Sequence, residues 1–522
     1  MNPLRASSTN QVCLPGRCKE FPVAVRLLAI WTWLAAGVLV GQAQSYSLTD
    51  LGFPPLAGAG SASEAHAMNQ NGDVVGTWWD GKSGRGSQYA FCYADGSNTD
   101  LGTLKSGGYD YAVANAINNA GQIVGQATTT GGGGYIYHAF LYTNGTMTDL
   151  DNTGQGWSSA NAINNGGEIA GEFTTPLGLI HGFIYTNGGF LDLGTLGGTY
   201  SSARGINDSG VIVGEASDAS NNVVAFVYNH GSMTGLGTLG GPYSAAFAIN
   251  ASGVIAGESS VSNGEVHAFI YRDGIMRDLG TLGGTNSTAQ AINNGGEVTG
   301  YALTTNEDAH AFLFNGTTMV DLHRAFTPPA GWTNMFLTLA YAINDAGQVA
   351  GGVNYVTNGM TNYDAFLLTP PALTLTCSTD ITVGASDPAG AIVAFNLTAA
   401  GGCSPATITA VPPSGSDFPV GTNIVSVTAS DLCGHTNTGS FTVTVLPPPP
   451  VVALSPTLGA GGSFSTGIQG AAGQTYVIQA STNLLTWIPV LTNTLTGTST
   501  NWSDADTGTN ELRFYRVLTL PQ

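Results

Sequence analysis

The chain has 522 residues, a formal net charge of −20 and only 9% charged residues, while glycine alone contributes 74 residues. A strongly acidic surface repels phosphate backbones, which argues against nucleic acid as a partner. Hydrophobic residues make up 43% of the chain, too many for a disordered protein, and the abundant glycine favours short strands joined by tight turns.

The first 43 residues are typical of a secretory signal peptide. Basic residues precede an uncharged apolar stretch at 27–40, and Gly41-Gln42-Ala43 offers small residues at the positions that a signal peptidase reads. The apolar stretch is short for a membrane span, which needs about 20 residues. We therefore expect cleavage after Ala43 and a secreted or cell-surface protein, with an uncleaved anchor as the alternative.

A cassette of about 45 residues recurs between Ser61 and Thr369. Each copy offers four short strands joined by turns such as Asn-x-x-Gly and Asn-Gly, which is the pattern of a propeller blade. Repetition at such a period indicates a propeller or a solenoid. The seven anchor asparagines of the cassette are Asn69, Asn118, Asn164, Asn207, Asn250, Asn293 and Asn344.

The two ends of the repeat region complement each other. The seventh copy, residues 341–369, stops after its third strand, and a fourth-strand sequence stands at Tyr46–Gly52. A ring closed in this way leaves no free sheet edge. The sequence therefore predicts an all-β fold with a seven-bladed β-propeller over residues 44–370. An open β-solenoid is the alternative, but it would not predict the split seventh unit.

The cassette resembles the bacterial extracellular HAF repeat. The resemblance rests on His138-Ala139-Phe140, His267-Ala268-Phe269 and His310-Ala311-Phe312, and on the Asp-Leu-Gly-Thr-Leu-Gly-Gly element at 278–284. It implies an exported protein of poorly defined function, and it implies no reaction.

Two further modules are predicted after the repeats. Residues 371–447 resemble a hyalin repeat (HYR) module through Leu375-Thr376-Cys377, Phe418-Pro419-Val420-Gly421-Thr422 and the segment 429–434. The resemblance implies an immunoglobulin-like β-sandwich with a role in extracellular adhesion. Residues 448–522 follow as a proline linker and a small second β-sandwich, which looks like terminal modules that attach exported proteins to a surface.

The late cysteines allow more than one pairing. Cys403 and Cys433 stand beside glycines in predicted turns, whereas Cys377 stands on a predicted strand. We expect a disulfide between Cys403 and Cys433 with Cys377 free, although three cysteines allow three single pairings.

Motifs for chemistry are missing from the sequence. No zinc, nucleophile-elbow, phosphate-loop or calcium-loop motif occurs, so we expect neither a metal nor a cofactor. The repeated histidines of the third strand stand on separate blades, and we expect each to bond a neighbouring backbone group. Recurring acids are expected to be solvated turn residues, although carboxylates on neighbouring blades could meet a substrate near the axis. These acids are Glu168, Glu172, Glu215, Glu258 and Glu297.

One pattern points to a binding site. Seven residues before the anchor asparagine, four consecutive copies carry an aromatic residue, where stacking on sugar rings is expected. The alternative is that each ring packs against the adjacent blade. The four residues are Tyr111, Trp157, Tyr200 and Tyr243.

These observations favour an exported, non-enzymatic binding or adhesion protein with an extracellular glycan or protein as its partner. Two alternatives remain at this point: a secreted enzyme that acts on polysaccharides, with carboxylates at the propeller axis, and a structural envelope or matrix component. The C-terminal module would serve for attachment to the cell surface. Nothing in the sequence indicates an oligomeric state.

Overall fold

A computed structural model describes residues 46–54, 61–80, 88–104, 111–131, 134–151, 156–386, 389–403, 406–431, 435–448, 450–459, 463–504 and 512–520. The predicted signal peptide, residues 1–43, lies outside the described residues. Across the described part of the chain, no helix combines the length and the apolar character needed to cross a bilayer.

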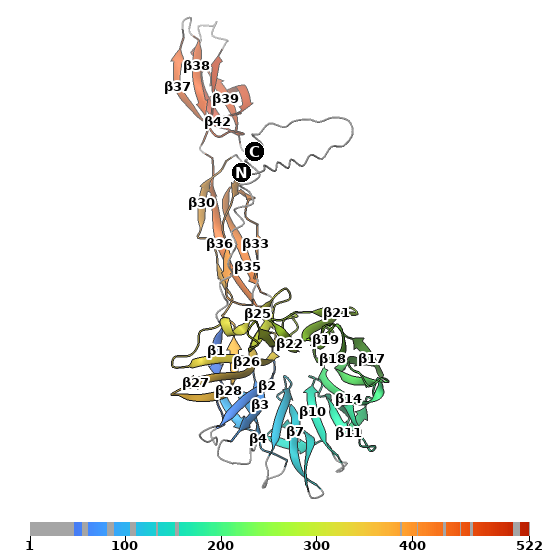
Figure 1. The fold of residues 1–522 in the computed structure, drawn as a ribbon. Helices are drawn as coiled ribbons and strands as arrows, with labels where there is room; N and C mark the ends of the chain where they lie inside the picture. The colour runs from blue at the N-terminus through green and yellow to red at the C-terminus, as the bar shows by residue number, and fades with distance from the viewer. Residues whose placement is uncertain are drawn as a thin grey trace, which may run out of the picture. The chain divides into compact units, whose positions relative to one another are not determined.

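Within the described residues, 46–369 fold into seven antiparallel sheets of four strands each, arranged about a common axis (Figure 1). The first sheet contains β2 (Ala62–Met68), β3 (Val74–Trp79), β4 (Gln88–Ala94) and β5 (Ser97–Asp100). The second contains β6 (Ala112–Ile117), β7 (Ile123–Gly131), β8 (Gly134–Thr143) and β9 (Thr146–Asp149). The third contains β10 (Ser158–Ile163), β11 (Ile169–Thr174), β12 (Ile180–Thr186) and β13 (Gly189–Asp192).

The next three sheets repeat this order. They are β14 (Gly197–Ile206), β15 (Ile212–Asp218), β16 (Val223–Asn229) and β17 (Ser232–Gly237); β18 (Gly240–Ile249), β19 (Ile255–Val261), β20 (Val266–Arg272) and β21 (Ile275–Asp278); and β22 (Gly283–Ile292), β23 (Val298–Thr304), β24 (Ala309–Phe314) and β25 (Met319–Asp321), followed by a 3-10 turn at Leu322–Arg324.

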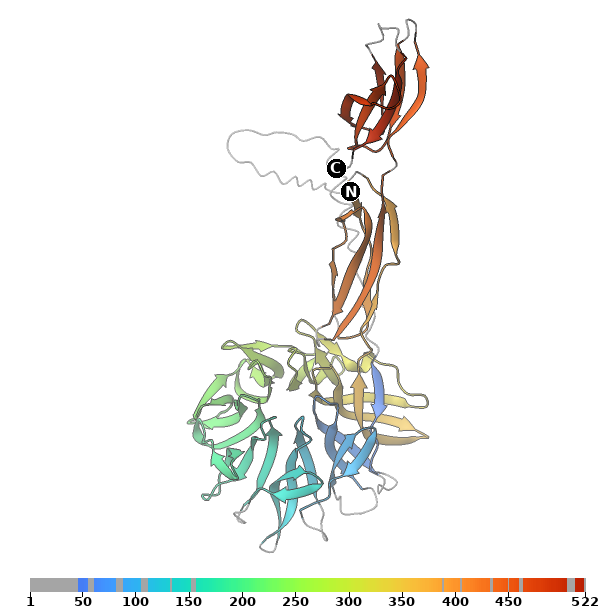
Figure 2. The same ribbon diagram turned by 180° about the vertical axis from the view of Figure 1, so that it is seen from behind.

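The seventh sheet joins the two ends of the repeat region. It contains β26 (Thr333–Ile343), β27 (Val349–Thr357) and β28 (Met360–Thr369), and its outer strand is β1 (Ser47–Asp50), which pairs antiparallel with β28. Figure 2 shows β1 in blue beside the yellow and orange strands of this sheet. The N-terminal strand thus lies where the split repeat predicts it.

Neighbouring sheets share their cores. Ile163 and Phe183 of the third sheet pack in one cluster with Val124 and Ala139 of the second. A single four-stranded unit is too small to bury its own apolar face, so stacking on the next unit completes the core. The third strand of every sheet places one phenylalanine at 1% exposure or less: Phe91, Phe140, Phe183, Phe226, Phe269, Phe312 and Phe366.

The repeated histidines contact an aspartate of their own sheet, and His138 also bonds a neighbouring backbone group, that of Gly156, as expected from the sequence. Nδ1 of His138 lies 2.8 Å from Oδ2 of Asp149, eleven residues later on the fourth strand. The same His–Asp pair recurs in three other sheets. In each of them the histidine of the third strand contacts the last residue of the fourth strand. These pairs are His181–Asp192, His267–Asp278 and His310–Asp321.

The seventh sheet breaks this rule. Asp364 stands in the histidine position, and Asp50 of β1 stands in the aspartate position, so two carboxyl groups interact where four other sheets have a His–Asp pair. Burial, together with the charge of Asp50, raises the pKa of Asp364 to about 6. Asp364 accepts a 2.5 Å hydrogen bond from the hydroxyl of Tyr355.

The chain after the repeats contains two further groups of sheets, each with its own core. In the first, β30 (Ile381–Gly384), β36 (Thr436–Leu446), β35 (Gly421–Ser430) and β33 (Thr407–Val411) form one sheet, with smaller pairings of β29 (Thr374–Thr376) with β32 (Thr398–Ala400) and of β31 (Gly390–Val393) with β34 (Ser416–Pro419). Phe418, Phe441 and Val443 lie in its core.

The second group has two three-stranded sheets around the buried ring of Tyr476. Their strands are β37 (Val452–Leu458), β38 (Phe464–Gln469) and β41 (Ser499–Asp504), and β40 (Ile488–Thr494), β39 (Thr475–Ser481) and β42 (Phe514–Thr519).

Candidate functional site

Each innermost strand of the seven sheets carries a β-bulge three residues before the anchor asparagine. In β10, for example, the pairing with β11 steps from Ala160 to Ala162 and leaves Asn161 as the extra residue. A bulge removes a residue from the ladder and re-aims its side chain. The seven bulged residues are His66, Asn115, Asn161, Arg204, Phe247, Gln290 and Tyr341.

A glycine stands opposite every bulge. A Cβ added at Gly171 would collide with the carbonyl oxygen of Ser159, and the same collision with the backbone of the facing strand recurs in the other six sheets. The position therefore requires glycine because the backbones approach too closely for a side chain. These residues are Gly76, Gly125, Gly171, Gly214, Gly257, Gly300 and Gly351.

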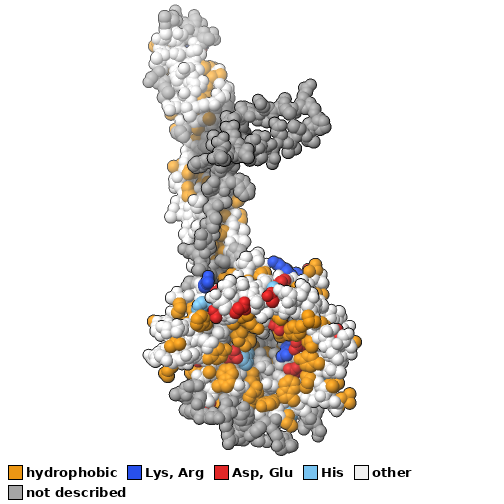
Figure 3. All heavy atoms as spheres, viewed as in Figure 1, with side chains coloured by type: hydrophobic (Ala, Val, Ile, Leu, Met, Phe, Trp, Pro, Cys, Tyr) orange, Lys and Arg blue, Asp and Glu red, His pale blue; other side chains and the backbone are white. Residues whose placement is uncertain are grey.

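All seven bulged side chains line one central cavity of about 650 Å³. Figure 3 shows acidic, basic and histidine side chains at the centre of this face, with hydrophobic side chains around them. Whereas the anchor position is asparagine in all seven copies, the bulge position carries six different residue types. A cavity walled by the varied position of a repeat is an arrangement suited to recognition of a particular ligand.

The four aromatic residues singled out from the sequence lie at the start of the innermost strands, next to this cavity, and Trp157 lines it. Each of the four is half-buried, so the structure places them neither fully open on the face nor fully packed between sheets. Each has a polar residue fifteen positions later on the second strand as its partner or neighbour. Tyr200 donates to Glu215 at 3.0 Å, Tyr243 donates to Glu258 at 2.9 Å, and Gln126 donates to the hydroxyl of Tyr111 at 3.1 Å.

Burial is the largest cause that raises the pKa of Tyr200 and Tyr243, and the charges of Glu215 and Glu258 add to it. Both hydroxyls therefore remain protonated donors at neutral pH, and each holds its carboxylate in place.

The third sheet departs from this pairing. Its aromatic residue is Trp157, and the acid fifteen positions later is Glu172, which is 8% exposed and lines the cavity. Among the described residues, no side chain donates a hydrogen bond to the carboxylate of Glu172, and Arg204 acts on it through charge. Glu172 is thus a buried acceptor that faces the cavity without a donor from its own sheet.

The acids expected as solvated turn residues are mostly not solvated, so that expectation was wrong. Glu172 and Glu215 are 8% exposed and lie within the strands β11 and β15, not in turns. Glu258 lies on β19 and accepts from both Tyr243 and Thr288. Two acids with a different role, Glu168 and Glu297, accept hydrogen bonds from anchor asparagines at 2.8 and 2.9 Å.

Two basic side chains complete the cavity wall, those of Arg204 and His66. Arg204 donates from Nη2 to Glu215 at 3.1 Å, and its buried Nε has no hydrogen-bond partner among the described residues. Nε2 of His66 lies 3.5 Å from Glu64. Burial alone would raise the pKa of Glu64, but the contacts with His66 and Tyr363 outweigh it and hold that pKa below its usual value.

The other end of the channel is built from the anchor asparagines. Each donates from Nδ2 to the backbone carbonyl of the next anchor, and Asn344 donates to Asn69 at 3.3 Å, which closes the ring. A smaller cavity of about 250 Å³ lies there. Met68, Ile206 and Ile249 line both cavities, so the two cavities adjoin at these aliphatic side chains.

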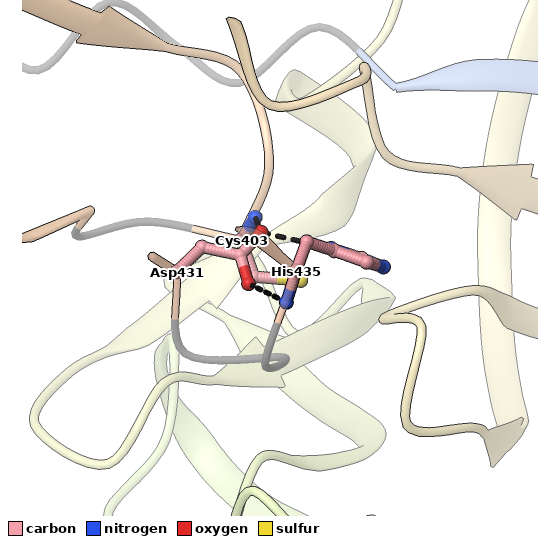
Figure 4. Close-up of side chains that lie close together, drawn as sticks. All are labelled: Cys403, Asp431 and His435. Carbon is pink, nitrogen blue, oxygen red and sulfur yellow. Dashed lines mark hydrogen bonds and ion pairs between the residues drawn. The ribbon is translucent and has the colours of Figure 1, made fainter. Parts of the chain in front are cut away.

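One further cluster lies in the segment that follows the repeats (Figure 4). Oδ2 of Asp431 accepts from the backbone N–H of Cys403 at 2.9 Å and lies 2.8 Å from Nδ1 of His435. A metal would be held by the thiolate, but the sulfur of Cys403 is disulfide-bonded. The cluster therefore connects the loop at Cys403 to the loop that contains Asp431 and His435 through hydrogen bonds.

The free thiols in the described residues are those of Cys92 and Cys377. Cys433 lies outside the described residues, so its pairing with Cys403 stays a prediction that peptide mapping without reduction can test. A bridge that includes Cys377 would contradict it.

Comparisons with known proteins add one family assignment. Residues 368–445 match the family model of the HYR domain, and the chain has no sequence match among the curated proteins. The similarity at 368–445 agrees with the HYR resemblance found from the sequence.

Several solved structures are similar to part of the chain. TolB from Acinetobacter baumannii is 13% identical over 59% of this chain and 63% of TolB, with a TM-score of 0.33. YCF48 bound to D1 peptide is 12% identical over 62% of this chain and 94% of that chain, with a TM-score of 0.34. The chain spans less than two thirds of TolB, and TM-scores of this size carry no argument about function.

The bulged residues were not singled out from the sequence. The pattern that could have found them is a position that changes from copy to copy, His66 in one and Arg204 in another, between an alanine-rich position and a constant asparagine. The four aromatic residues lie seven positions before the anchor, four positions before the bulge. Of these four, Trp157 is the one that lines the cavity.

Proposed function

We propose that this chain is an exported, non-enzymatic binding or adhesion protein that holds its ligand in the cavity walled by the seven bulged residues. The observation that carries the proposal is that each of the seven sheets has a β-bulge with a glycine opposite it. The bulged residue, which varies from sheet to sheet, lines the same cavity of about 650 Å³ in every case. Bulges of this kind are enriched beside functional sites, where they re-aim a side chain.

The proposal includes a closed seven-bladed propeller of the HAF-repeat type. The ring of anchor asparagines and the pairing of β1 with β28 support closure. The HYR domain, a module usually found outside the cell, supports an exported protein. In this proposal the HYR module serves as a spacer and the C-terminal module as an attachment to the cell surface, and the partner is an extracellular glycan or protein.

The proposal is tested by screening the purified chain on arrays of glycans and extracellular proteins, together with a variant whose cavity is filled. Gln290→Trp narrows the cavity, since Gln290 lines it, and we expect binding to be lost. Ser220→Trp, in the exposed turn between β15 and β16, is the matched control and should bind as the parent does. Equal binding by both variants would show that the ligand binds elsewhere.

A second candidate, an enzyme that acts on polysaccharides, is favoured by the carboxylates around the cavity. A general acid needs a raised pKa, whereas the pKa of Glu64 is lowered and tyrosines hold Glu215 and Glu258. Release of reducing ends from a bound polysaccharide, lost in Glu172→Gln while binding persists, would favour the enzyme.

A further inference from the structure

The charges around the cavity are unbalanced. Three carboxylates, those of Glu64, Glu172 and Glu215, lie in its wall or contact residues of the wall, against the single guanidinium of Arg204 and the imidazole of His66. An anionic ligand is therefore repelled.

Glu172 is the one carboxylate of this set that lacks a donor from its own sheet. The hydroxyl of Tyr200 donates a hydrogen bond to Glu215, and that of Tyr243 donates one to Glu258. In the third sheet the same repeat position is Trp157, which has no hydroxyl to donate to Glu172. A buried carboxylate needs either a donor or a counter-charge. Arg204 supplies part of that charge, but it is hydrogen-bonded to Glu215.

The wall beside Glu172 is aromatic. Trp157, Phe247 and Tyr341 line the same cavity. Aromatic faces attract a cationic group through their quadrupole, and they do so more strongly where water is excluded. A neutral ligand could stack on these rings as well, but it would leave Glu172 with Arg204 as its counter-charge, which Glu172 shares with Glu215.

From these observations we infer that the cavity binds a protonated primary amine, with Glu172 as the acceptor of the ammonium group and Trp157 as its aromatic wall. The inference rests on the proposed function and names the chemistry of its ligand. Two kinds of extracellular partner present this group: an amino sugar of a glycan, and a lysine side chain of a protein.

The test is a calorimetric titration of the full chain with three probes that differ at one position: D-glucosamine, N-acetyl-D-glucosamine and D-glucose. We expect D-glucosamine to bind at least about tenfold more tightly than the two neutral sugars, because only it carries the charge. Nα-acetyl-lysine methylamide distinguishes the source, since binding of this probe in place of D-glucosamine points to a lysine side chain.

Glu172→Gln keeps the shape of the side chain and removes its charge, and we expect it to weaken binding of the amine by about tenfold or more. Glu307→Gln, in the exposed turn between β23 and β24, removes the same charge away from the cavity and should leave binding unchanged. Both variants are checked for parental melting temperatures before titration.

Several outcomes would overturn the inference. Equal affinity for D-glucose, an unchanged affinity of Glu172→Gln, or displacement of the amine by calcium chloride would each do so. If the amines do not bind but an array ligand binds and is lost in Gln290→Trp, the inference fails and the proposed function stands. If no ligand binds in either experiment, both fail.

Discussion

The two ends of the central channel are built from positions only three residues apart on the same seven strands. At one end the side chain is always asparagine, and each asparagine bonds the backbone of the next sheet until Asn344 bonds Asn69. At the other end the bulged residues differ from sheet to sheet and surround the cavity. The asparagine position closes the ring, and the bulged position is the one that we propose for ligand recognition.

The difference follows from hydrogen bonding. An anchor asparagine is donor and acceptor at once, since the side chain of Asn250 donates to the backbone carbonyl of Asn293 in the next sheet and accepts from the backbone N–H of Val254 in its own sheet. A bulged residue stands outside the strand ladder, and its side chain can change without loss of a ladder bond. The predictions below test this contrast, from the largest expected effect to the smallest.

The largest effect is expected from opening the ring. Deletion of residues 44–53 removes β1, including the buried Leu51, and leaves β28 as an unpaired edge. We expect the melting temperature to fall by roughly 10 °C or more, because several buried contacts are lost at once. Differential scanning calorimetry measures it, and an unchanged melting curve would mean that β1 does not close the ring.

The next effect tests the constant position. Asn250→Ala removes the 3.1 Å bond to Asn293 and leaves the backbone N–H of Val254 unpaired in a buried site. We expect the free energy of unfolding to fall by about 2–4 kcal/mol, measured by urea titration. Asn263→Ala, in an exposed turn, should change it by about 0.5 kcal/mol or less. A loss of the same size in both variants would contradict a special role for the anchor position.

The pH dependence of stability tests the closing sheet. Because the pKa of Asp364 is raised to about 6 in the folded chain, its protonated form stabilises the fold at low pH. That stabilisation is fully present below the unfolded pKa and is lost as pH rises through about 6. We expect a loss of about 2–3 kcal/mol between about pH 4 and pH 7. Asp364→Asn should abolish this slope in urea titrations, and a slope equal to the parent's would refute the assignment.

The smallest effect is expected on ligand affinity, and it separates ligand binding from packing within one sheet. Trp157→Ala removes a half-buried cavity wall, so ligand affinity should fall by about 1–3 kcal/mol. Phe183→Ala removes a fully buried ring, so stability should fall by about 3–5 kcal/mol while the folded fraction still binds. If Trp157→Ala costs as much stability as Phe183→Ala, the ring is structural.

The sequence by itself determined the strands, the repeat and the position of the closing strand. Local signals set these features: Asn-x-x-Gly turns fix where strands reverse, and the Val/Ile-rich and His-Ala-Phe segments have the pattern of strands. The split between Tyr46–Gly52 and residues 341–369 was also visible, because a repeat reveals which of its parts is missing.

Only the tertiary structure decided which side chains meet at the axis. The bulge at Asn161 arises from the pairing of two strands, and one extra residue changes the side to which a side chain points. The acids were misjudged for the same reason: Glu172 and Glu215 look like repeated polar residues in the sequence, but the stacking of seven sheets buries them in the channel wall. Burial depends on contacts between residues about 40 positions apart, which no local pattern records.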